Sequence, residues 1–288
     1  MGDQIRFKIQ DLRFKIQNSK FKWAVVMGGC IVMGMTVWAL SRAGSREDEI
    51  WGRIQAQGVF TVATDASYPP FSAVDEFGNL FGFEIDLAEA IGRRWGVRVE
   101  FENIAYDALL GTLVSQREEA VISAFVPQPG RAKEISFTRS YFVGGTVAVV
   151  RTASRNLGLL TDDLEQWAAG KTIAVEYGAG GDALARQWAR RVAGLTILPK
   201  PTASEALAAV EAGEADATLV DAISAYDFLL GHPTLTLAGP PLEPEPYTIA
   251  VRAESQRLFQ ELESVLQAME DDGALPALRV KWFGEAAR

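Results

Sequence analysis

The sequence has very little cysteine and histidine. Its 288 residues contain one of each, Cys30 and His232, which lie far apart in the chain. A single cysteine cannot form a disulfide within the chain, and it gives no information on the redox compartment. Zinc sites and histidine-dependent catalytic triads need groups of such residues, which this chain lacks. We therefore expect no metal site and no cofactor.

Basic residues are also scarce once the N-terminal region is set aside. Residues 47–288 carry 20 Lys+Arg and 35 Asp+Glu, a formal charge of −15. Nucleic acid and anionic lipid would repel such an acidic body. Small molecules and proteins are therefore the expected partners, and nucleic acid is not.

The long apolar run of the chain lies near its N-terminus. Residues 23–40 are 18 uncharged, mostly apolar residues, which as a helix would span about 27 Å, close to the hydrocarbon thickness of a bilayer. Basic residues precede the run and a partly acidic stretch follows it. This asymmetry predicts a transmembrane or signal segment with the body on the periplasmic, extracytoplasmic side. The alternative is a buried helix of the core.

The fate of that segment stays open. It could be retained as an anchor in the cytoplasmic membrane, cleaved near "ALSRAGS", or lipidated at Cys30. Upstream, residues 1–22 hold a basic seven-residue repeat, "RFKIQDL" then "RFKIQNS". It is either an amphipathic helix at the membrane surface or a low-complexity repeat before the true start codon. We expect residues 1–22 to be disordered.

The body alternates between strand and helix patterns. Residues 82–96 read as a helix with Leu87, Ile91 and Trp95 at spacing four, ended by Gly96. Strand patterns at 97–104 and 120–125 enclose a second helix at 106–119. Such alternation predicts a parallel sheet covered by helices.

The same alternation restarts after the middle of the chain. Strands are predicted at 171–178, 195–200 and 215–221, separated by helices at 182–193 and 204–213, with Ser204 as N-cap. The Pro-rich "GPPLEPEPY" precedes a strand at 248–252 and a final helix at 258–273. Two similar α/β units imply a cleft between them, where ligands commonly bind.

The first predicted strand stops abruptly in "TDASYPPF". Two prolines restrict their neighbours to extended conformations and hold the chain stiff at the strand end. This presents Asp65, Tyr68 and Phe71 together. The alternative is that the rings cap the core and Asp65 is a turn residue.

Five motifs in order resemble those of family 3 extracellular solute-binding proteins, the polar amino-acid receptors of ABC importers. They are "TDASYPPF", "GNLFGFEIDLAEAIG", the Arg131 region with "FTRSYF", "VEAGEADATLVD" and "MEDDGALPALRVKWFG", and the resemblance covers about residues 54–285. It implies a two-lobed α/β periplasmic-binding-protein fold of type II, with a two-strand hinge that closes on ligand. Lobe 1 would comprise 51–144 and 248–288, and lobe 2 would comprise 147–244.

The resemblance also implies a function: an extracytoplasmic receptor, not an enzyme, that delivers an amino acid or similar small polar solute to an ABC permease. Arg131 matches the family's carboxylate-binding arginine and Asp221 its ammonium-binding aspartate. Tyr68 and Tyr106 would stack on the ligand's side chain, Asp65 would reach its polar end, and Gly180 in "GAGG" would help to hold the carboxylate. Otherwise Arg131 is a solvated arginine and Asp221 a helix N-cap.

This chain departs from the family pattern where hydroxyl side chains are common. Val126, Gln128 and Ala179 stand at those positions, so up to three hydroxyls are missing from the cradle. The ligand is then either bound less polarly or not a standard α-amino acid.

Two other functions were weighed. Cyclohexadienyl or arogenate dehydratases share this fold and use a glutamate near the glycine loop, where this chain has Asp182. A sensory domain would precede an output module, which we do not expect because four residues follow "KWFG". The sequence identifies neither the ligand, the permease nor the oligomeric state.

Overall fold

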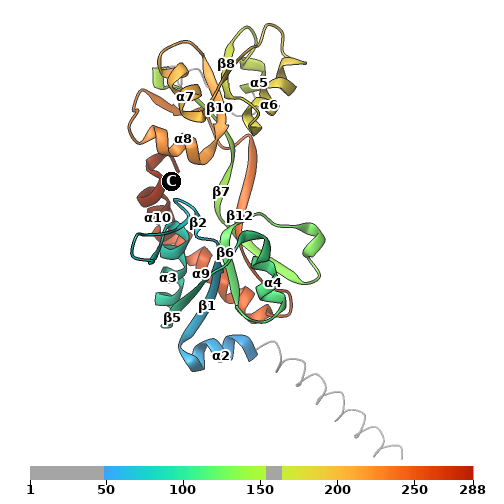
Figure 1. Ribbon diagram of the computed structural model, residues 1–288, viewed down its shortest axis with the longest axis vertical. Coiled ribbons are helices and arrows are strands. Elements are labelled where there is room, and N and C mark those ends of the chain that lie inside the picture. Colours follow the sequence, from blue (N-terminus) through green and yellow to red (C-terminus); the bar gives the residue numbers. More distant parts are fainter. Residues whose placement is uncertain (1–48, 154–163, 288) are drawn as a thin grey trace, which may run out of the picture.

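The computed structural model describes residues 49–153 and 164–287. Figure 1 shows two α/β bodies, lobe 1 and lobe 2, connected by the long strands β7 (Ile135–Arg151) and β12 (Glu243–Arg252). The predicted segments 1–22 and 23–40 lie outside the described residues. In those that are described, no helix has the length and apolar character needed to cross a membrane.

Lobe 1 contains the elements from α2 to the start of β7, joined by the end of β12 and the C-terminal helices. Its elements are α2 (Glu49–Gln57), β1 (Val59–Thr64), β2 (Ser67–Tyr68), β3 (Ser72–Val74), β4 (Leu80–Phe81), α3 (Phe83–Trp95), β5 (Arg98–Asn103), η1 (Tyr106–Ala108), α4 (Leu109–Val114), β6 (Ala120–Phe125), η2 (Pro129–Arg131), α9 (Gln256–Asp271), α10 (Ala274–Phe283) and η5 (Glu285–Ala287).

Lobe 2 contains the elements between the two long strands. They are α5 (Leu164–Trp167), β8 (Thr172–Glu176), α6 (Gly180–Ala189), β9 (Thr196–Lys200), α7 (Ala203–Glu211), β10 (Ala217–Asp221), α8 (Ala222–Leu229) and β11 (Leu235–Leu237). The exact residue boundaries expected for the two lobes stay a prediction.

The sheet is mixed. Its strand order among the described residues is β5-β1-β6-β12-β7-β10-β8-β9, with β11 on β7. In this sheet, pairs such as β1 with β5 and β8 with β9 are parallel, whereas β12 and β7 run antiparallel to their neighbours. A separate sheet of β2, β3 and β4 in lobe 1 is antiparallel. The predicted parallel units are confirmed, and two antiparallel strands carry the chain between them.

The two linking strands approach each other closely. A Cβ atom added to Gly145 of β7 would lie 1.9 Å from the backbone oxygen of Glu243 in β12, and Gly145 has a φ of +96°. Both facts require glycine there. β12 begins at Glu243, five residues before the predicted strand, despite Pro244 and Pro246. Residues 243–247 pair with β7 but not with β6, and prolines are tolerated on such a free edge.

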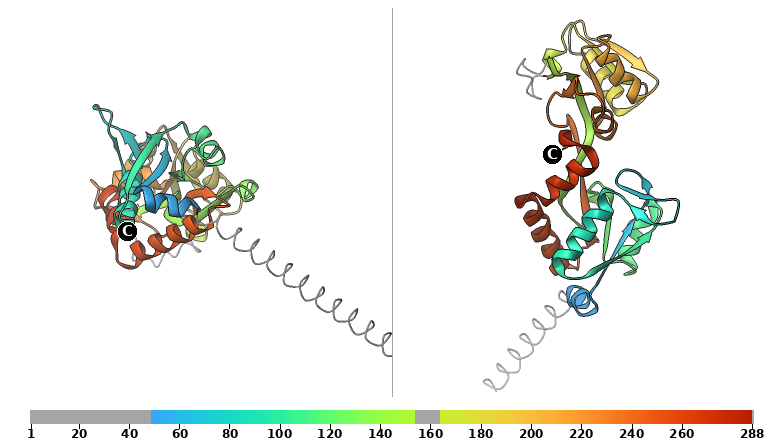
Figure 2. Two further views of the ribbon diagram at one scale, coloured as in Figure 1. Left: turned by 90° about the horizontal axis from the view of Figure 1, so that it is seen from below. Right: turned by 90° about the vertical axis from the view of Figure 1, so that its left-hand side faces the viewer.

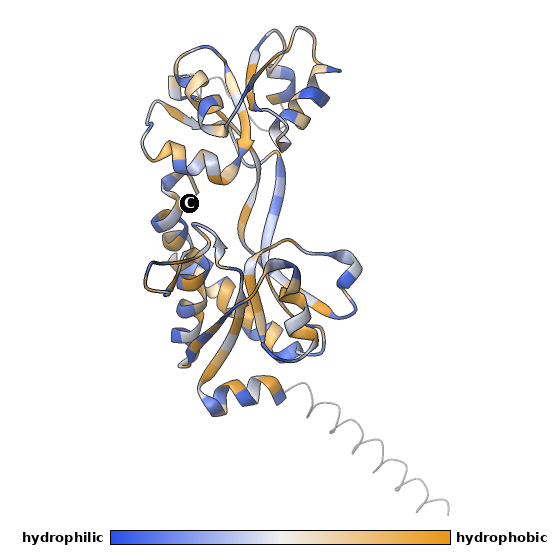
Figure 3. Ribbon diagram, viewed as in Figure 1, coloured by the Kyte–Doolittle hydropathy of each residue, from blue (hydrophilic) through white to orange (hydrophobic). Residues whose placement is uncertain are grey.

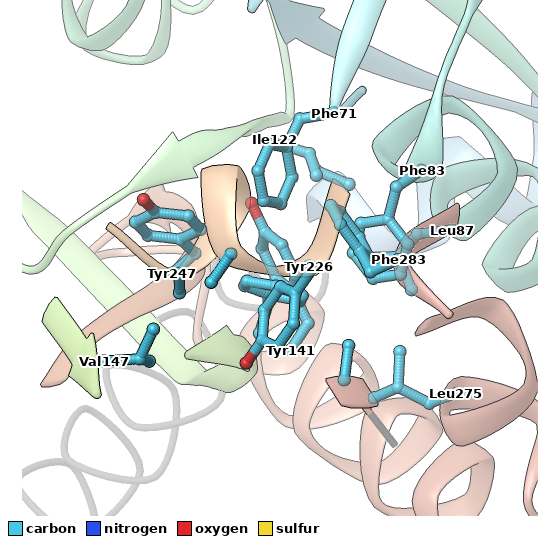
Figure 4. Close-up of a cluster of buried hydrophobic side chains, with 14 of the residues drawn as sticks. Phe71, Phe83, Leu87, Ile122, Tyr141, Val147, Tyr226, Tyr247, Leu275 and Phe283 are labelled. Carbon is cyan, nitrogen blue, oxygen red and sulfur yellow. The ribbon is translucent and has the colours of Figure 1, made fainter. Parts of the chain in front are cut away.

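Apolar residues form the interior of both lobes. Strands are mostly apolar and helices are two-sided in Figure 3, and α3 buries the predicted Leu87 and Ile91. One buried cluster joins lobe 1 to α8 of lobe 2, where Tyr226 meets Phe283 of α10 with ring centroids 6.2 Å apart (Figure 4). The right-hand view of Figure 2 shows the same two-lobed arrangement from the side.

Two local predictions were wrong. The helix expected at 106–119 is only the short η1 and α4, and it ends before Gln116, which has a φ of +58°. The N-cap of α7 is Thr202, not Ser204, because the Thr202 side chain accepts the Glu205 N–H. Both predictions used only the local pattern of residue types, whereas the helix end and the cap depend on backbone conformation.

Candidate ligand-binding site

Asp65 lies directly after β1 and joins three segments of lobe 1. Its Oδ2 accepts the Tyr106 N–H at 2.9 Å, and its Oδ1 accepts the Ser67 N–H at 3.0 Å. Its own N–H donates to Ser123 Oγ at 3.0 Å. The carboxylate is half-buried and still has lone pairs left for a ligand. Asp65 and Tyr106, 41 residues apart in sequence, are thus brought together.

Tyr68 and Tyr106 form two aromatic platforms. The Tyr68 ring stacks on Phe71 and the Tyr106 ring stacks on Phe125, each with centroids 5.3 Å apart. Each tyrosine remains exposed, at 43% and 46%, while Phe71 is fully buried. The tyrosines therefore have surface free for a ligand. Phe71 is instead a core residue, in agreement with the alternative that this ring caps the core.

Tyr68 also lies close to the linking strand β12. The Tyr247 side chain of that strand, which the sequence did not point to, interacts with the Tyr68 hydroxyl. Burial chiefly raises the pKa of Tyr68, and the charges of Asp221 and Glu245 raise it further. Asp221 of lobe 2 therefore lies within electrostatic reach of the Tyr68 platform.

On the lobe 2 side, Asp221 and Gly180 both lie beside Thr146. Asp221 ends β10 and is paired in register with Thr146 of β7, so their side chains share a face of the sheet. A Cβ on Gly180 would lie 3.4 Å from Thr146 Oγ1. Asp221 caps α8 by accepting the Ser224 N–H at 2.9 Å, as the alternative reading expected. Thr146 supplies a hydroxyl that the family pattern did not point to.

Arg131 is the predicted site residue that stands apart. It lies in η2, is exposed, and forms a 3.4 Å ion pair with Glu134. Among the described residues, no side-chain hydrogen bond or ion pair joins it to the other five. The arrangement thus joins Asp65 with Tyr106, and Gly180 with Asp221, but not Arg131 with either pair.

A cavity of about 390 Å³ lies between the lobes beside these residues. Its lining comes from the proline pair after Tyr68, from α8 after Asp221, and from the end of α10: Pro69, Pro70, Ile223, Ser224, Asp227, Trp282 and Phe283. Both lobes therefore border this space, and its lining residues include none of the six candidates.

Asp182, the residue at the dehydratase position, is 4% exposed and already has partners. Its Oδ2 accepts the Gly178 N–H at 3.0 Å, and its Oδ1 lies 2.8 Å from Arg186 Nε. These contacts hold the glycine loop in shape. Within residues 49–153 and 164–287, no group of three or more His, Cys, Asp or Glu could hold a metal ion.

Comparison with known proteins agrees with this architecture. Residues 60–285 match the family of bacterial extracellular solute-binding proteins, family 3. The chain belongs to this family. The L-cystine-binding protein TcyJ of Escherichia coli (strain K12) is 28% identical, over 90% of this chain and 93% of that protein.

Solved structures support the fold. The unliganded, open L-cystine solute receptor of Neisseria gonorrhoeae has a TM-score of 0.71 at 23% identity, covering 83% of this chain and 98% of that one. An ancestral cyclohexadienyl dehydratase has a TM-score of 0.68 at 24% identity, covering 80% and 95%. At these identities the likeness shows the type II periplasmic-binding-protein fold alone, and the dehydratase is a distant relative.

Proposed function

We propose that this protein is an extracytoplasmic receptor that binds an amino acid or a similar small polar solute between its lobes and delivers it to an ABC permease. The observation that carries the proposal is that Tyr68 of lobe 1 has an exposed ring within electrostatic reach of Asp221 of lobe 2, in a member of a solute-binding family. Relatives named for cystine and arginine binding support the amino-acid class.

Residues of both lobes bind different groups of the ligand. Asp221 binds the α-ammonium, while Arg131 and the N–H groups at Gly180 bind the α-carboxylate after the lobes close. The rings of Tyr68 and Tyr106 hold the side chain, and Asp65 meets its polar end. Asp65 favours an amide or a cation there and repels a carboxylate.

The ligand is bound and released unchanged. The only acid at the dehydratase position, Asp182, is occupied by Gly178 and Arg186, so it is not placed to protonate a leaving hydroxyl. Incubation with prephenate and with arogenate should give no product. Turnover that Asp182→Asn abolishes would contradict this part of the proposal.

The body is carried across the cytoplasmic membrane by residues 23–40, which stay as its anchor. Support comes from the apolar length and the flanking charges of the sequence. Alkaline phosphatase fused after Arg288 should be active, since it folds only outside the cytoplasm. An inactive fusion, with an active cytoplasmic reporter at the same position, would contradict the topology.

A ligand screen tests the receptor directly. The full chain, in mild detergent, is melted with each of the twenty amino acids, L-cystine and common polyamines. A ligand at 100 times its Kd stabilises the folded state by about 2.7 kcal/mol. We expect stabilisation by an amide, a cationic amino acid or cystine. Stabilisation by glutamate or aspartate alone would overturn the assignment of Asp65.

A further inference from the structure

Glu84 is a buried acid with no part in the ligand contacts proposed above. It lies in the first turn of α3 and is 1% exposed. Its Oε1 accepts the Tyr141 hydroxyl at 2.5 Å and the Ala124 N–H at 2.5 Å, and its Oε2 accepts the Ser72 hydroxyl at 2.9 Å. No cation pairs with it among these contacts. A buried carboxylate with three donors connects the segments that supply them.

One of those segments carries the Tyr68 platform. Ser72 follows Phe71, on whose ring Tyr68 stacks. The Glu84 backbone N–H also donates to the Phe71 oxygen at 2.9 Å. Backbone and side chain of one residue therefore fix both Phe71 and its neighbour.

A second segment, the end of β6, supports Tyr106 and Asp65. Ala124 lies between Ser123, which accepts the Asp65 N–H, and Phe125, on which Tyr106 stacks. Ala124 has a φ of +45°, which an alanine adopts only under constraint. Its N–H donates to Glu84 and, at 3.0 Å, to the Tyr141 hydroxyl that Glu84 itself holds, and these bonds keep the conformation in place. The conformation sets where Ser123 and Phe125 point.

We propose that Glu84 is a positioning residue of the ligand-binding site, whose buried carboxylate fixes the separation of the Tyr68 platform from Asp65 and Tyr106. The expected effect on ligand affinity rests on the proposed function, since a receptor selects its ligand by that separation. The effect on the positions of the rings and Asp65 in the ligand-free protein does not depend on that function.

Lobe 1 offers a closely matched control. Glu119 is a glutamate buried to 4% exposure that likewise accepts a backbone N–H and a hydroxyl, both from Thr61. It also pairs with Arg53. Thr61 lies early in β1, whereas the site residue Asp65 follows the end of that strand. Loss of Glu119 should therefore destabilise the same lobe without reaching the platforms.

The test compares Glu84→Met, Glu84→Gln and Glu119→Met in the full chain. Ligand-free crystal structures give the positions of Asp65, Tyr68 and Tyr106. Calorimetric titration with L-cystine, L-arginine and L-glutamine, carried out well below the melting temperature of each variant, gives the affinities. Glu84→Met should displace the platforms. It should also lower the affinity for whichever of these amino acids binds wild type by about tenfold or more. Glu84→Gln keeps an oxygen for Ala124 and Tyr141, so it should stay within about threefold of wild type.

Glu119→Met should lower the melting temperature with both platforms and affinity unchanged. Platforms that stay in place in Glu84→Met would overturn the proposal, as would equal affinity losses in Glu84→Met and Glu119→Met. If no probe binds wild type, the proposed ligand class fails, while the ligand-free structures still decide the positioning role. If Glu84→Met does not fold, Ser72→Ala against Thr61→Ala repeats the comparison on the two hydroxyl donors.

Discussion

The two lobes present different chemistry to the space between them. Lobe 1 offers aromatic rings and Asp65, each held from beneath by buried partners. Lobe 2 offers small groups at helix starts: Asp221 at α8, Gly180 at α6, and Thr146 beside them. The first set can select a ligand by the shape and charge of its side chain. The second, together with Arg131 of lobe 1, suits the groups that all α-amino acids share, so selectivity should depend on the rings and Asp65 of lobe 1.

The largest effect should come from the lobe 2 contact. Removing Asp221 leaves a ligand ammonium unpaired, which typically costs about 2–5 kcal/mol, roughly a 30- to several-thousand-fold loss of affinity. We expect Asp221→Ala to show this by calorimetric titration for every amino acid that binds. Arg131→Ala, on lobe 1, should show the same at the carboxylate, although its guanidinium pairs with Glu134.

Asp221 also caps α8, so its loss costs stability as well. Thr202→Ala is the control, because it removes the cap of α7 in the same lobe. Both variants should melt lower, and only Asp221→Ala should lose affinity. Near wild-type binding by Asp221→Ala and Arg131→Ala would show that the charged ends of the ligand are held elsewhere.

A smaller and more selective effect is expected on lobe 1. Tyr106→Ala removes one exposed ring, and stacking of this kind contributes about 0.5–1.5 kcal/mol beyond the area that it buries. The loss should differ between ligands with different side chains, in contrast to Asp221→Ala. Phe77→Ala, at an 80% exposed ring in the same lobe, is the control and should leave binding unchanged. A uniform loss across ligands for Tyr106→Ala would remove the distinction between the lobes.

The smallest effect is a pH dependence of stability that belongs to lobe 1. Burial raises the pKa of Glu84, opposed by the donors Tyr141, Ala124 and Ser72. The folded state therefore binds the proton of the Glu84 carboxyl more tightly than the unfolded state does. The stability that this proton contributes is fully present below the unfolded pKa of about 4.5, and it is lost as pH rises through the pKa of the folded state. The stability of wild type relative to Glu84→Gln should thus increase as pH falls through that window. A pH-independent difference in denaturant titrations would contradict it.

Local sequence was enough to predict most of the fold. Spacing four and a terminal glycine gave α3, which runs Phe83–Trp95 within the predicted 82–96. The start of β12 was not predictable, because Pro244 and Pro246 argue against a strand unless one knows that β6 leaves that edge free. Likewise the end of α4 depends on the backbone at Gln116.

Local pattern alone pointed to candidate site residues only where they are adjacent in sequence, and the other candidates, Tyr106, Arg131, Gly180 and Asp221, depended on the family resemblance. "TDASYPPF" indicated Asp65 and Tyr68 because the prolines make their local geometry rigid. Glu84 looked like an ordinary first-turn acid, since its partners Ala124 and Tyr141 are 40 and 57 residues away. Tyr247 and Thr146 were missed for the same reason. The ligand roles of all six predicted residues stay predictions.

The aromatic contact between α8 and α10 bears on how the molecule melts. Tyr226, Phe283 and Phe142 of β7 belong to one buried cluster, which includes residues of both lobes. If one lobe unfolds, the cluster residues of the other lobe lose their packing partners and become exposed to water. The two lobes should therefore unfold together in a single cooperative transition. A solute held by either lobe would then delay the denaturation of the whole chain.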